Sequence, residues 1–321
     1  MENKDMQDKD IQDKDIQDNR NTVPEAEKRL LFIYNPNAGR GIIKKNLSDI
    51  LELFCRAGYE VSVFATQGEG DAKKALVRRG RLFDRIVCCG GDGTLNDITD
   101  GMMELEDRPL CGYIPAGTVN DFARSFKLPQ NMIDAAKIAI TGEKCFCDIG
   151  ELNGDYFDYV AAFGAFTEVS YETPQATKNI LGKLAYFLEG VKKLGSIKKN
   201  RIKVTIGDEV IEDDVIYGMV TNSFSVGGFL SLFDDDVALD DGKLEAFFIK
   251  APKNILEFQP IINALLAGDV NCNMFYYRHI TEISIESEEP LKWTVDGEYG
   301  GEYKTSVIRT YEKAIPFVRG C

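Results

Sequence analysis

The sequence contains very little histidine and no excess of positive charge. Its 321 residues include one histidine, His279, and the formal net charge is −14. A single histidine argues against catalytic triads and against zinc sites built from several histidines. An acidic chain lacks the basic face through which proteins bind nucleic-acid phosphates, so we expect no nucleic-acid partner.

Long apolar runs are missing as well. The sequence has no stretch of about 18 apolar residues and no signal-peptide core, so we expect a cytoplasmic protein without a transmembrane segment. The eight cysteines are scattered, and Cys145-Phe-Cys147 lacks the spacing of a zinc knuckle. Reduced thiols are the simpler interpretation. There is also no Walker A lysine motif and no protein-kinase motif set.

Residues 1–25 differ from the rest of the chain. A five-residue unit, Lys-Asp-Met-Gln-Asp, starts at Lys4 and is repeated from Lys9 and Lys14 with Ile in place of Met. One apolar residue in five fits neither a helix nor a strand. We therefore expect a disordered acidic tail.

Strand and helix patterns alternate between residues 29 and 149. We expect strands at 29–35, 59–65, 84–89, 110–114 and 144–149, and helices at about 47–58, 70–80, 95–104 and 131–141. This alternation predicts parallel βαβ units, with ligands bound at the carboxyl edge of the sheet.

The pattern changes after Gly150 to strands joined by short turns. We expect strands at 156–166, 201–206, 214–222, 243–250, 274–286 and 291–295, and helices at 179–194 and about 256–266. Pro260 should mark the first turn of the latter helix or kink it. Successive strands with short turns predict an antiparallel sandwich or barrel. The end of the chain, 306–317, would pack back on either part.

A glycine-rich turn follows the strand expected at 84–89. Gly90, Gly91 and Gly93 surround Asp92, and the missing Cβ atoms would let a ligand approach the backbone. The helix that follows offers N–H groups to an anion. The Asp92 carboxylate would repel a phosphate unless a divalent cation or an acceptor hydroxyl lay between them. We interpret the turn as a metal-dependent nucleotide site; for this motif alone an ordinary strand-to-helix turn is the alternative.

Six motifs, in order along the chain, resemble those of the soluble bacterial diacylglycerol kinases. They occupy residues 35–39, 91–96, 115–123, 169–174, 239–244 and 295–301. The resemblance runs from about Leu30 to the C-terminus. It is more specific than the motif Gly-Gly-Asp-Gly-Thr, which NAD kinases share and which phosphofructokinases share with Ser for Thr.

The resemblance implies an α/β fold with two domains. Residues 26–150, with about 305–321, would form an NAD-kinase-like, three-layer nucleotide domain, and 151–304 a mainly antiparallel β-sandwich for the lipid. The implied reaction moves the γ-phosphoryl group of ATP to the hydroxyl of 1,2-diacylglycerol with the help of Mg²⁺, giving phosphatidic acid. Alternatives are a kinase acting on a sphingoid base, ceramide, another lipid or NAD, and a homologue that only binds nucleotide or lipid.

The resemblance also implies roles for particular residues. The ATP-binding positions would be Asn35, Pro36, Asn37, Ala38, Gly39, Thr66, Gly91, Asp92, Gly93, Thr94, Leu95, Asn96, Asp97 and Thr118. Asp97 stands where the family pattern has glutamate, which puts its contact in doubt. Ala238, Asp241 and Lys243 would hold a magnesium ion directly, and Asp121 and Asp148 would hold it through water.

Glu298 would be the proton acceptor of the reaction, with Asp296 beside it. On a strand these two side chains would point to opposite faces, but Gly297 between them predicts a turn in which both face the cleft. A plain hairpin turn is the alternative for Asp-Gly-Glu alone.

A lipid substrate requires contact with a membrane, so we expect a peripheral protein at the inner face of the membrane. We hypothesise docking through the basic residues Lys192, Lys193, Lys198, Lys199, Arg201 and Lys203. A solvated helix end is the alternative. A homodimer is possible by analogy with family members.

Removal of residues 1–24 tests the expectation for the tail. Because that segment carries too few apolar residues to pack on a core, the truncated protein should keep its thermal midpoint and its turnover number. A lowered turnover number in the truncated protein would contradict this.

Overall fold

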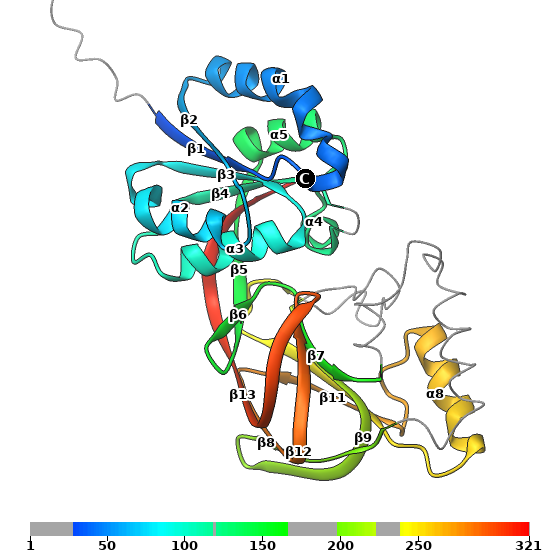
Figure 1. The fold of residues 1–321 in the computed structure, drawn as a ribbon. Coiled ribbons are helices and arrows are strands. Elements are labelled where there is room, and N and C mark those ends of the chain that lie inside the picture. Colours follow the sequence, from blue (N-terminus) through cyan, green and yellow to red (C-terminus); the bar gives the residue numbers. More distant parts are fainter. Residues whose placement is uncertain (1–27, 118–119, 166–197, 223–237, 321) are drawn as a thin grey trace, which may run out of the picture.

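The computed structural model describes residues 28–117, 120–165, 198–222 and 238–320. The structure has an α/β part formed by the first half of the chain and a β-rich C-terminal part, as expected, and Figure 1 shows the two parts joined by long strands. Within the described ranges, no helix is both long and apolar enough to cross a membrane.

A parallel sheet forms the centre of the α/β part. Its strands are β1 (Lys28–Tyr34), β2 (Tyr59–Ala65), β3 (Arg85–Gly90) and β4 (Leu110–Pro115), in the order β2-β1-β3-β4. Both faces of β1 are buried, since Leu31 and Ile33 belong to one core cluster while Leu30 and Phe32 belong to another. Burial on both faces explains why β1, β3 and β4 are mostly apolar, whereas β2, at the edge of the sheet, contains Glu60 and Ser62.

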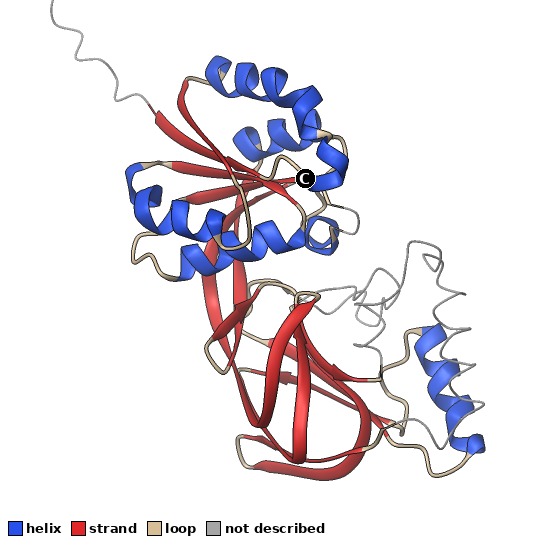
Figure 2. Ribbon diagram, viewed as in Figure 1, coloured by secondary structure: helices blue, strands red, loops and turns tan. Residues whose placement is uncertain are grey.

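Helices cover both faces of this sheet (Figure 2). One face carries α1 (Ile43–Arg56) and α5 (Met132–Thr141), and the other carries α2 (Asp71–Arg79) and α3 (Asp92–Met103). The α5 helix begins where the Asn131 side chain accepts hydrogen bonds from the N–H groups of Ile133 and Asp134. Three short elements, η1 (Ala38–Gly41), η2 (Gly80–Leu82) and α4 (Asp121–Ser125), complete this part.

Antiparallel strands build the C-terminal part. They are β5 (Glu143–Leu152), β6 (Asp155–Phe157), β7 (Val160–Gly164), β8 (Asn200–Ile206), β9 (Glu209–Thr221), β10 (Leu244–Lys250), β11 (Phe275–Ile280) and β12 (Glu282–Val295). Successive residues of β10 face two different cores: Phe248 contributes to one, with Trp293, and Phe247 to the other, beside helix α8 (Ile255–Ala267).

The last strand, β13 (Glu298–Arg319), belongs to both parts. Its first half pairs with β12, its second half pairs with β5, and Phe317 lies in register with Cys111 of β4. The expected return of the chain end therefore takes the form of a strand that continues the central sheet of the α/β part.

Several boundaries differ from the expectation. The strand expected at 274–286 ends at Ile280, and β12 then runs from Glu282 through Pro290 to Val295 as one strand. The pairing with β13 shifts between Glu286 and Leu291, so a bulge accommodates the missing N–H of the proline. The strand expected at 156–166 is also divided, and Pro260 lies inside α8, beyond its first turn. The helix expected at 179–194 lies outside the described residues.

Replacing Phe317 by alanine tests the role of β13. Phe317 is fully buried, and its ring lies 4.9 Å from that of Phe122 and 5.5 Å from that of Phe126. The substitution should lower the free energy of unfolding by about 3–5 kcal/mol in denaturant titrations. Lys304→Ala, at an exposed position of the same strand, should change it by less than about 0.5 kcal/mol.

Candidate active site

Four turns meet at the carboxyl edge of the parallel sheet. The N–H of Asn35, after β1, donates to Cys89 O of β3 at 2.9 Å, and the N–H of Thr66, after β2, donates to Tyr34 O at 2.9 Å. The N–H of Ala116, after β4, donates to Gly90 O at 2.7 Å. The turns after β1, β3 and β4, which contain the glycines, therefore lie together at the edge where the sequence predicts ligand binding, and the turn after β2 lies beside them.

The turn after β1 is held by the Asn35 side chain. Its Oδ1 accepts a hydrogen bond from the N–H of Asn37 at 2.9 Å, and its Nδ2 donates to Thr94 Oγ1 at 3.5 Å. Gly39 has φ +55°, and a Cβ there would lie 2.3 Å from Ala116 O. Glycine is required at position 39 for two reasons: the backbone is left-handed there, and the turn lies close to the turn after β4.

The glycine-rich turn is tighter than expected. Helix α3 begins at Asp92, with Gly91 as its N-cap, and not at Leu95, so Asp92 lies in the first helical turn. A Cβ on Gly117 would lie 2.7 Å from Gly91 Cα, so these glycines let two turns touch. Asp92 Oδ2 accepts a hydrogen bond from the N–H of Asn120 at 3.0 Å, which further joins the turns after β3 and β4.

Glu298 reaches across from the β-rich part to the first turn of α3. A Cβ on Gly93 would lie 2.6 Å from Glu298 Oε1, so the carboxylate occupies the space that a side chain at position 93 would fill. The pKa of Glu298 is raised by loss of part of its hydration and by the nearby Glu69 carboxylate. The structure thus brings two predicted site residues, Gly93 and Glu298, into contact across the two parts.

Asp296 occupies the hairpin turn between β12 and β13. It has φ 48° and Gly297 has φ 88°, the two left-handed residues of a type I′ turn, for which Asp-Gly is a favoured pair. The predicted turn is confirmed, but Asp296 does not face open solvent: only 9% of its surface is exposed.

Four donors hold the Asp296 carboxylate. Its Oδ1 accepts hydrogen bonds from the N–H groups of Tyr159 and Val160 at 3.1 and 2.8 Å, and its Oδ2 accepts from the N–H of Asp158 at 3.1 Å and from Asn96 Nδ2 at 2.9 Å. Burial raises the pKa of Asp296, although these hydrogen bonds oppose the shift. The four donors favour the charged form of this carboxylate.

Sequence reasoning missed a second buried carboxyl group, that of Asp158. It is 4% exposed and accepts a hydrogen bond from Thr99 Oγ1 on α3 at 2.8 Å. Burial raises its pKa well above the ordinary value, and the Asp296 charge raises it further. Because Asp296 has four donors, Asp158 is the member of the pair that takes up a proton. Only its place between two aromatic residues, Tyr-Phe-Asp-Tyr, hinted at burial.

Asn96 and Asp97, both predicted to bind ATP, make protein contacts. The Asn96 amide donates to Asp296, and Asp97 Oδ1 accepts from the N–H of Gly70, which caps α2, at 3.2 Å. Burial raises the pKa of Asp97 to about 6. The shorter arm of aspartate here serves the start of α2, and a nucleotide contact of either residue stays a prediction.

Asp148 lies at the loop predicted to bind magnesium. Its carboxylate accepts hydrogen bonds from the N–H groups of Gly242 and Lys313, both at 2.6 Å, and its own N–H donates to Leu239 O at 2.7 Å. Burial raises its pKa, and the carboxylates of Asp241 and Asp240 contribute. The predicted proximity of Asp148 and this loop is therefore observed.

Other predicted positions carry less structural information. Asp121 is the first residue of α4, Pro36 lies in the turn after β1, and Ala38 is the first residue of η1. Thr118, the motif at 169–174, Lys192 and Lys193 lie outside the described residues. Among the described side chains, no group of three or more His, Cys, Asp or Glu residues is arranged to hold a metal ion.

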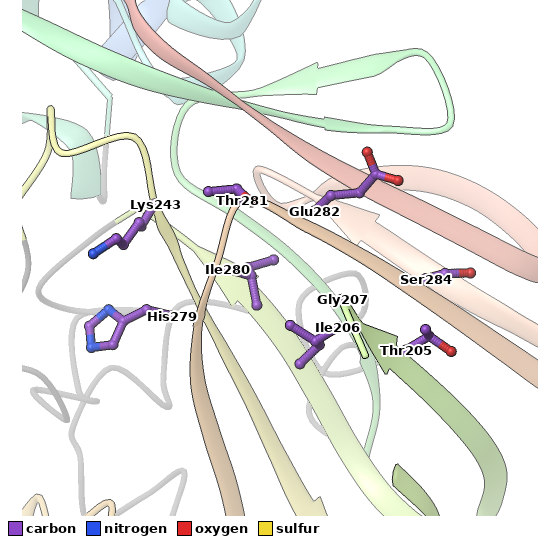
Figure 3. A pocket seen from close by; sticks show the side chains of 9 residues that line it. All are labelled: Thr205, Ile206, Gly207, Lys243, His279, Ile280, Thr281, Glu282 and Ser284. Atoms are coloured by element: carbon purple, nitrogen blue, oxygen red, sulfur yellow. The ribbon is translucent and has the colours of Figure 1, made fainter. Parts of the chain in front are cut away.

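A surface hollow of about 640 Å³ lies on the β-rich part (Figure 3). Lys243 and His279 line it together with residues of β8 and β12. His279 Nδ1 lies 3.5 Å from Oε1 of the buried Glu245, so the single histidine has a partner within the protein.

Comparison with known proteins places this arrangement in context. Residues 29–152 match the family described as "Diacylglycerol kinase catalytic domain". The chain is 37% identical over 287 residues to a diacylglycerol kinase of Bacillus subtilis (strain 168), covering 88% of this chain and 94% of that protein. It is 36% identical over 277 residues to a diacylglycerol kinase of Staphylococcus saprophyticus, covering 86% and 90%.

Solved structures share the fold. A crystal structure of a diacylglycerol kinase from Bacillus anthracis str. Sterne superposes with a TM-score of 0.72 at 26% identity, covering 92% of this chain and 97% of that one. A further crystal structure from the same organism, with the same coverage, gives a TM-score of 0.76 at 29% identity.

The Asp158 carboxyl group predicts how stability depends on pH. The pKa of Asp158 is 3.8 in the unfolded chain and well above that in the folded protein, so between these two values only the folded protein holds the proton. The free energy of unfolding therefore falls as the pH rises through this range. One such proton changes the free energy of unfolding by about 1.4 kcal/mol per pH unit.

Asp158→Asn removes this dependence. In denaturant titrations the variant should be more stable than the wild type at pH 8, and the difference should shrink as the pH is lowered toward 5. Equal pH dependence in the two proteins would show that Asp158 is ionised in the folded state.

Proposed function

The chain belongs to the diacylglycerol kinase family, and we propose from this that it transfers the γ-phosphoryl group of ATP to the free hydroxyl of a 1,2-diacylglycerol, giving phosphatidic acid. The observation that carries the proposal is the Glu298 carboxylate lying against Gly93 at the start of α3. A candidate base and a candidate phosphate-binding turn, 205 positions apart in the sequence, thus form one site.

We assign the nucleotide to the turns at the carboxyl edge of the parallel sheet. The first turn of α3 offers N–H groups and the positive end of the helix dipole to phosphate oxygens. The tight contacts of Gly39 with Ala116 and of Gly91 with Gly117 would hold the surrounding turns in place. In this proposal residues 26–150 and about 305–321 form an NAD-kinase-like, three-layer nucleotide domain, and 151–304 a mainly antiparallel sandwich for the lipid.

Glu298 is the proposed base. The lipid hydroxyl would donate its proton to the Glu298 carboxylate as its oxygen bonds to the γ-phosphorus, and the bond from phosphorus to the ADP oxygen would break. A base works best when its pKa approaches the working pH, and the pKa of Glu298 is shifted upward, in that direction. In the same proposal the four hydrogen bonds to Asp296 keep the hairpin in place while the proton moves.

Magnesium fits the acidic loop. Asp148 lies beside Asp240 and Asp241, whose charges raise its pKa, and a divalent cation would relieve that repulsion. We propose Ala238, Asp241 and Lys243 as direct ligands, the first and third through backbone carbonyls, and Asp121 and Asp148 as ligands through water. When bound, Mg²⁺ supplies neutralisation of phosphate charge.

The lipid implies action at a membrane surface, at the inner face of the membrane. Two of the basic residues considered for docking have acidic partners. Arg201 Nη1 lies 3.4 Å from Asp214 Oδ1, and Lys203 Nζ lies 3.4 Å from Glu286 Oε1, which favours a smaller role for these basic residues in docking. These acidic partners lower the net charge that an anionic surface would meet. A homodimer remains a proposal by analogy.

Glu298→Gln tests the role of the base. The amide keeps the size of the side chain but accepts no proton, so kcat on dispersed diacylglycerol should fall about 100-fold or more while the thermal midpoint stays within about one degree. Glu302→Gln, at an exposed position of the same strand, is the matched control and should keep full turnover. Near-normal turnover of the Glu298 variant would remove Glu298 from this role.

A panel of acceptors tests the substrate. The protein, labelled ATP and Mg²⁺ are incubated with diacylglycerol, ceramide, a sphingoid base or NAD, and the products are separated by thin-layer chromatography. We expect label in phosphatidic acid. Label in another product would redirect the assignment, and no labelled product at all would support a homologue that only binds its ligands.

A further inference from the structure

Two buried carboxyl groups, Asp158 and Asp296, lie at the junction of the α/β part and the β-rich part. Asp296 is held by the proposed catalytic hairpin, and Asp158 precedes β7. The two residues are joined directly, because the backbone N–H of Asp158 donates to the side-chain Oδ2 of Asp296 at 3.1 Å. Burying two neighbouring carboxyl groups lowers stability unless hydrogen bonds and protonation offset the lost hydration and the repulsion between them. Such a pair therefore suggests a functional role.

Helix α3 supplies one side-chain hydrogen bond to each carboxyl group of this pair. Asn96 donates to Asp296, and Thr99, one turn further along the helix, donates to Asp158 at 2.8 Å. The first turn of the same helix holds Gly93, against which Glu298 lies. One helix therefore carries the proposed phosphate-binding turn, the contact surface for Glu298 and two hydrogen bonds that fix the hairpin bearing Glu298.

We infer that Asp158 is a positioning residue for the transfer reaction: bound to Thr99, it fixes the Asp296 turn against α3 and so sets the place of Glu298 over Gly93. This inference rests on the proposed function. Asp158 acts through Asp296 and is not itself a base, since it is 4% exposed and bonded to Thr99.

The protonation of Asp158 completes the arrangement. The charges of Asp296 in the hairpin and of Asp92 and Asp100 on α3 all raise the pKa of Asp158. A second full charge at position 158 would repel the Asp296 carboxylate and loosen the turn. A neutral carboxyl group keeps the contact with Thr99 without that repulsion.

Two variants remove the contact and one preserves it. Thr99→Val keeps the shape of a fully buried side chain but removes the donor, and Asp158→Ala removes the acceptor. Asp158→Asn keeps a neutral polar group of the same shape. Ser306→Ala is the matched control, because it removes a buried hydroxyl that accepts from Trp293 Nε1 at 2.8 Å, in the core of the β-rich part.

Steady-state kinetics with ATP and dispersed diacylglycerol gives the first measurement. Misplacing a reacting group by a fraction of an ångström slows the chemical step, so kcat should fall about tenfold or more in Thr99→Val and Asp158→Ala, with both KM values changed less than about twofold. Asp158→Asn and Ser306→Ala should keep kcat within about twofold of the wild type.

Hydrogen–deuterium exchange gives a second measurement that does not depend on activity. Amides of Tyr159 and Val160 donate to Asp296, so peptides covering residues 158–160 and 294–300 should exchange faster in Thr99→Val and Asp158→Ala but not in Ser306→Ala. Thr99→Val serves alone if Asp158→Ala fails to fold.

The outcomes separate cleanly. Unchanged exchange in the hairpin of Thr99→Val, or full kcat despite faster exchange, overturns the inference, as does loss of kcat in Asp158→Asn equal to that in Asp158→Ala. Absence of turnover by the wild type on every acceptor overturns the proposed function instead, and the exchange data then still decide whether Asp158 fixes the turn.

Discussion

A buried carboxylate, that of Asp296, joins the two parts of this protein. Three of its hydrogen bonds come from backbone N–H groups at the start of β7 and the fourth comes from Asn96 on α3. Charge-assisted hydrogen bonds are stronger than neutral ones, and here they offset the cost of burying an anion. These hydrogen bonds hold the hairpin between β12 and β13 against α3. The hairpin in turn places Glu298 in the candidate site.

Close backbone contacts provide the second constraint. None of Gly90, Gly91 and Gly93 has a positive φ, so their turn needs glycine for space and not for an unusual backbone conformation. The space at Gly90 is filled by Thr94, that at Gly91 adjoins Gly117, and that at Gly93 is filled by Glu298. The space left by the missing Cβ atoms, which we expected a ligand to use, is thus occupied in part by atoms of the protein itself. At Gly93 this packing fixes the position of Glu298, the candidate base.

The sequence was most informative where local pattern decides the structure. Strand β2 matches its expected range, and β1, β3 and β4 agree to within one residue. Most residues of β1, β3 and β4 are apolar and buried, whereas β2 shows an alternation of apolar and polar residues, and both patterns are local. The sequence pattern predicted a break between strands at residues 286 and 291. In the structure a bulge near Pro290 lets β12 continue through this segment. Local pattern also misplaced the start of α3, since Gly91 and Gly93 lower helix propensity while the contact with Glu298 comes from a distant segment.

Site contacts between distant segments were harder to foresee. The motif resemblance placed Glu298 and Gly93 in one site, and the structure brings them together. Asp158 carries no motif, because its partners Thr99 and Asp296 lie 59 and 138 positions away. Asn96 ends a motif and Asp97 follows it, yet the Asn96 side chain contacts Asp296 at the junction and the Asp97 side chain contacts the start of α2. A motif identifies a neighbourhood, whereas individual contacts depend on tertiary packing.

The path of β13 has a consequence for how the chain is made. A ribosome releases β1, β2, β3 and β4 long before residues 298–319, yet β4 borders β13 in the finished sheet, with Cys111 beside Phe317. Until residues 298–319 have been made, the growing polypeptide exposes the open edge of β4, which is prone to wrong pairing. The sheet of the α/β part can therefore be completed only after the whole β-rich part has been synthesised.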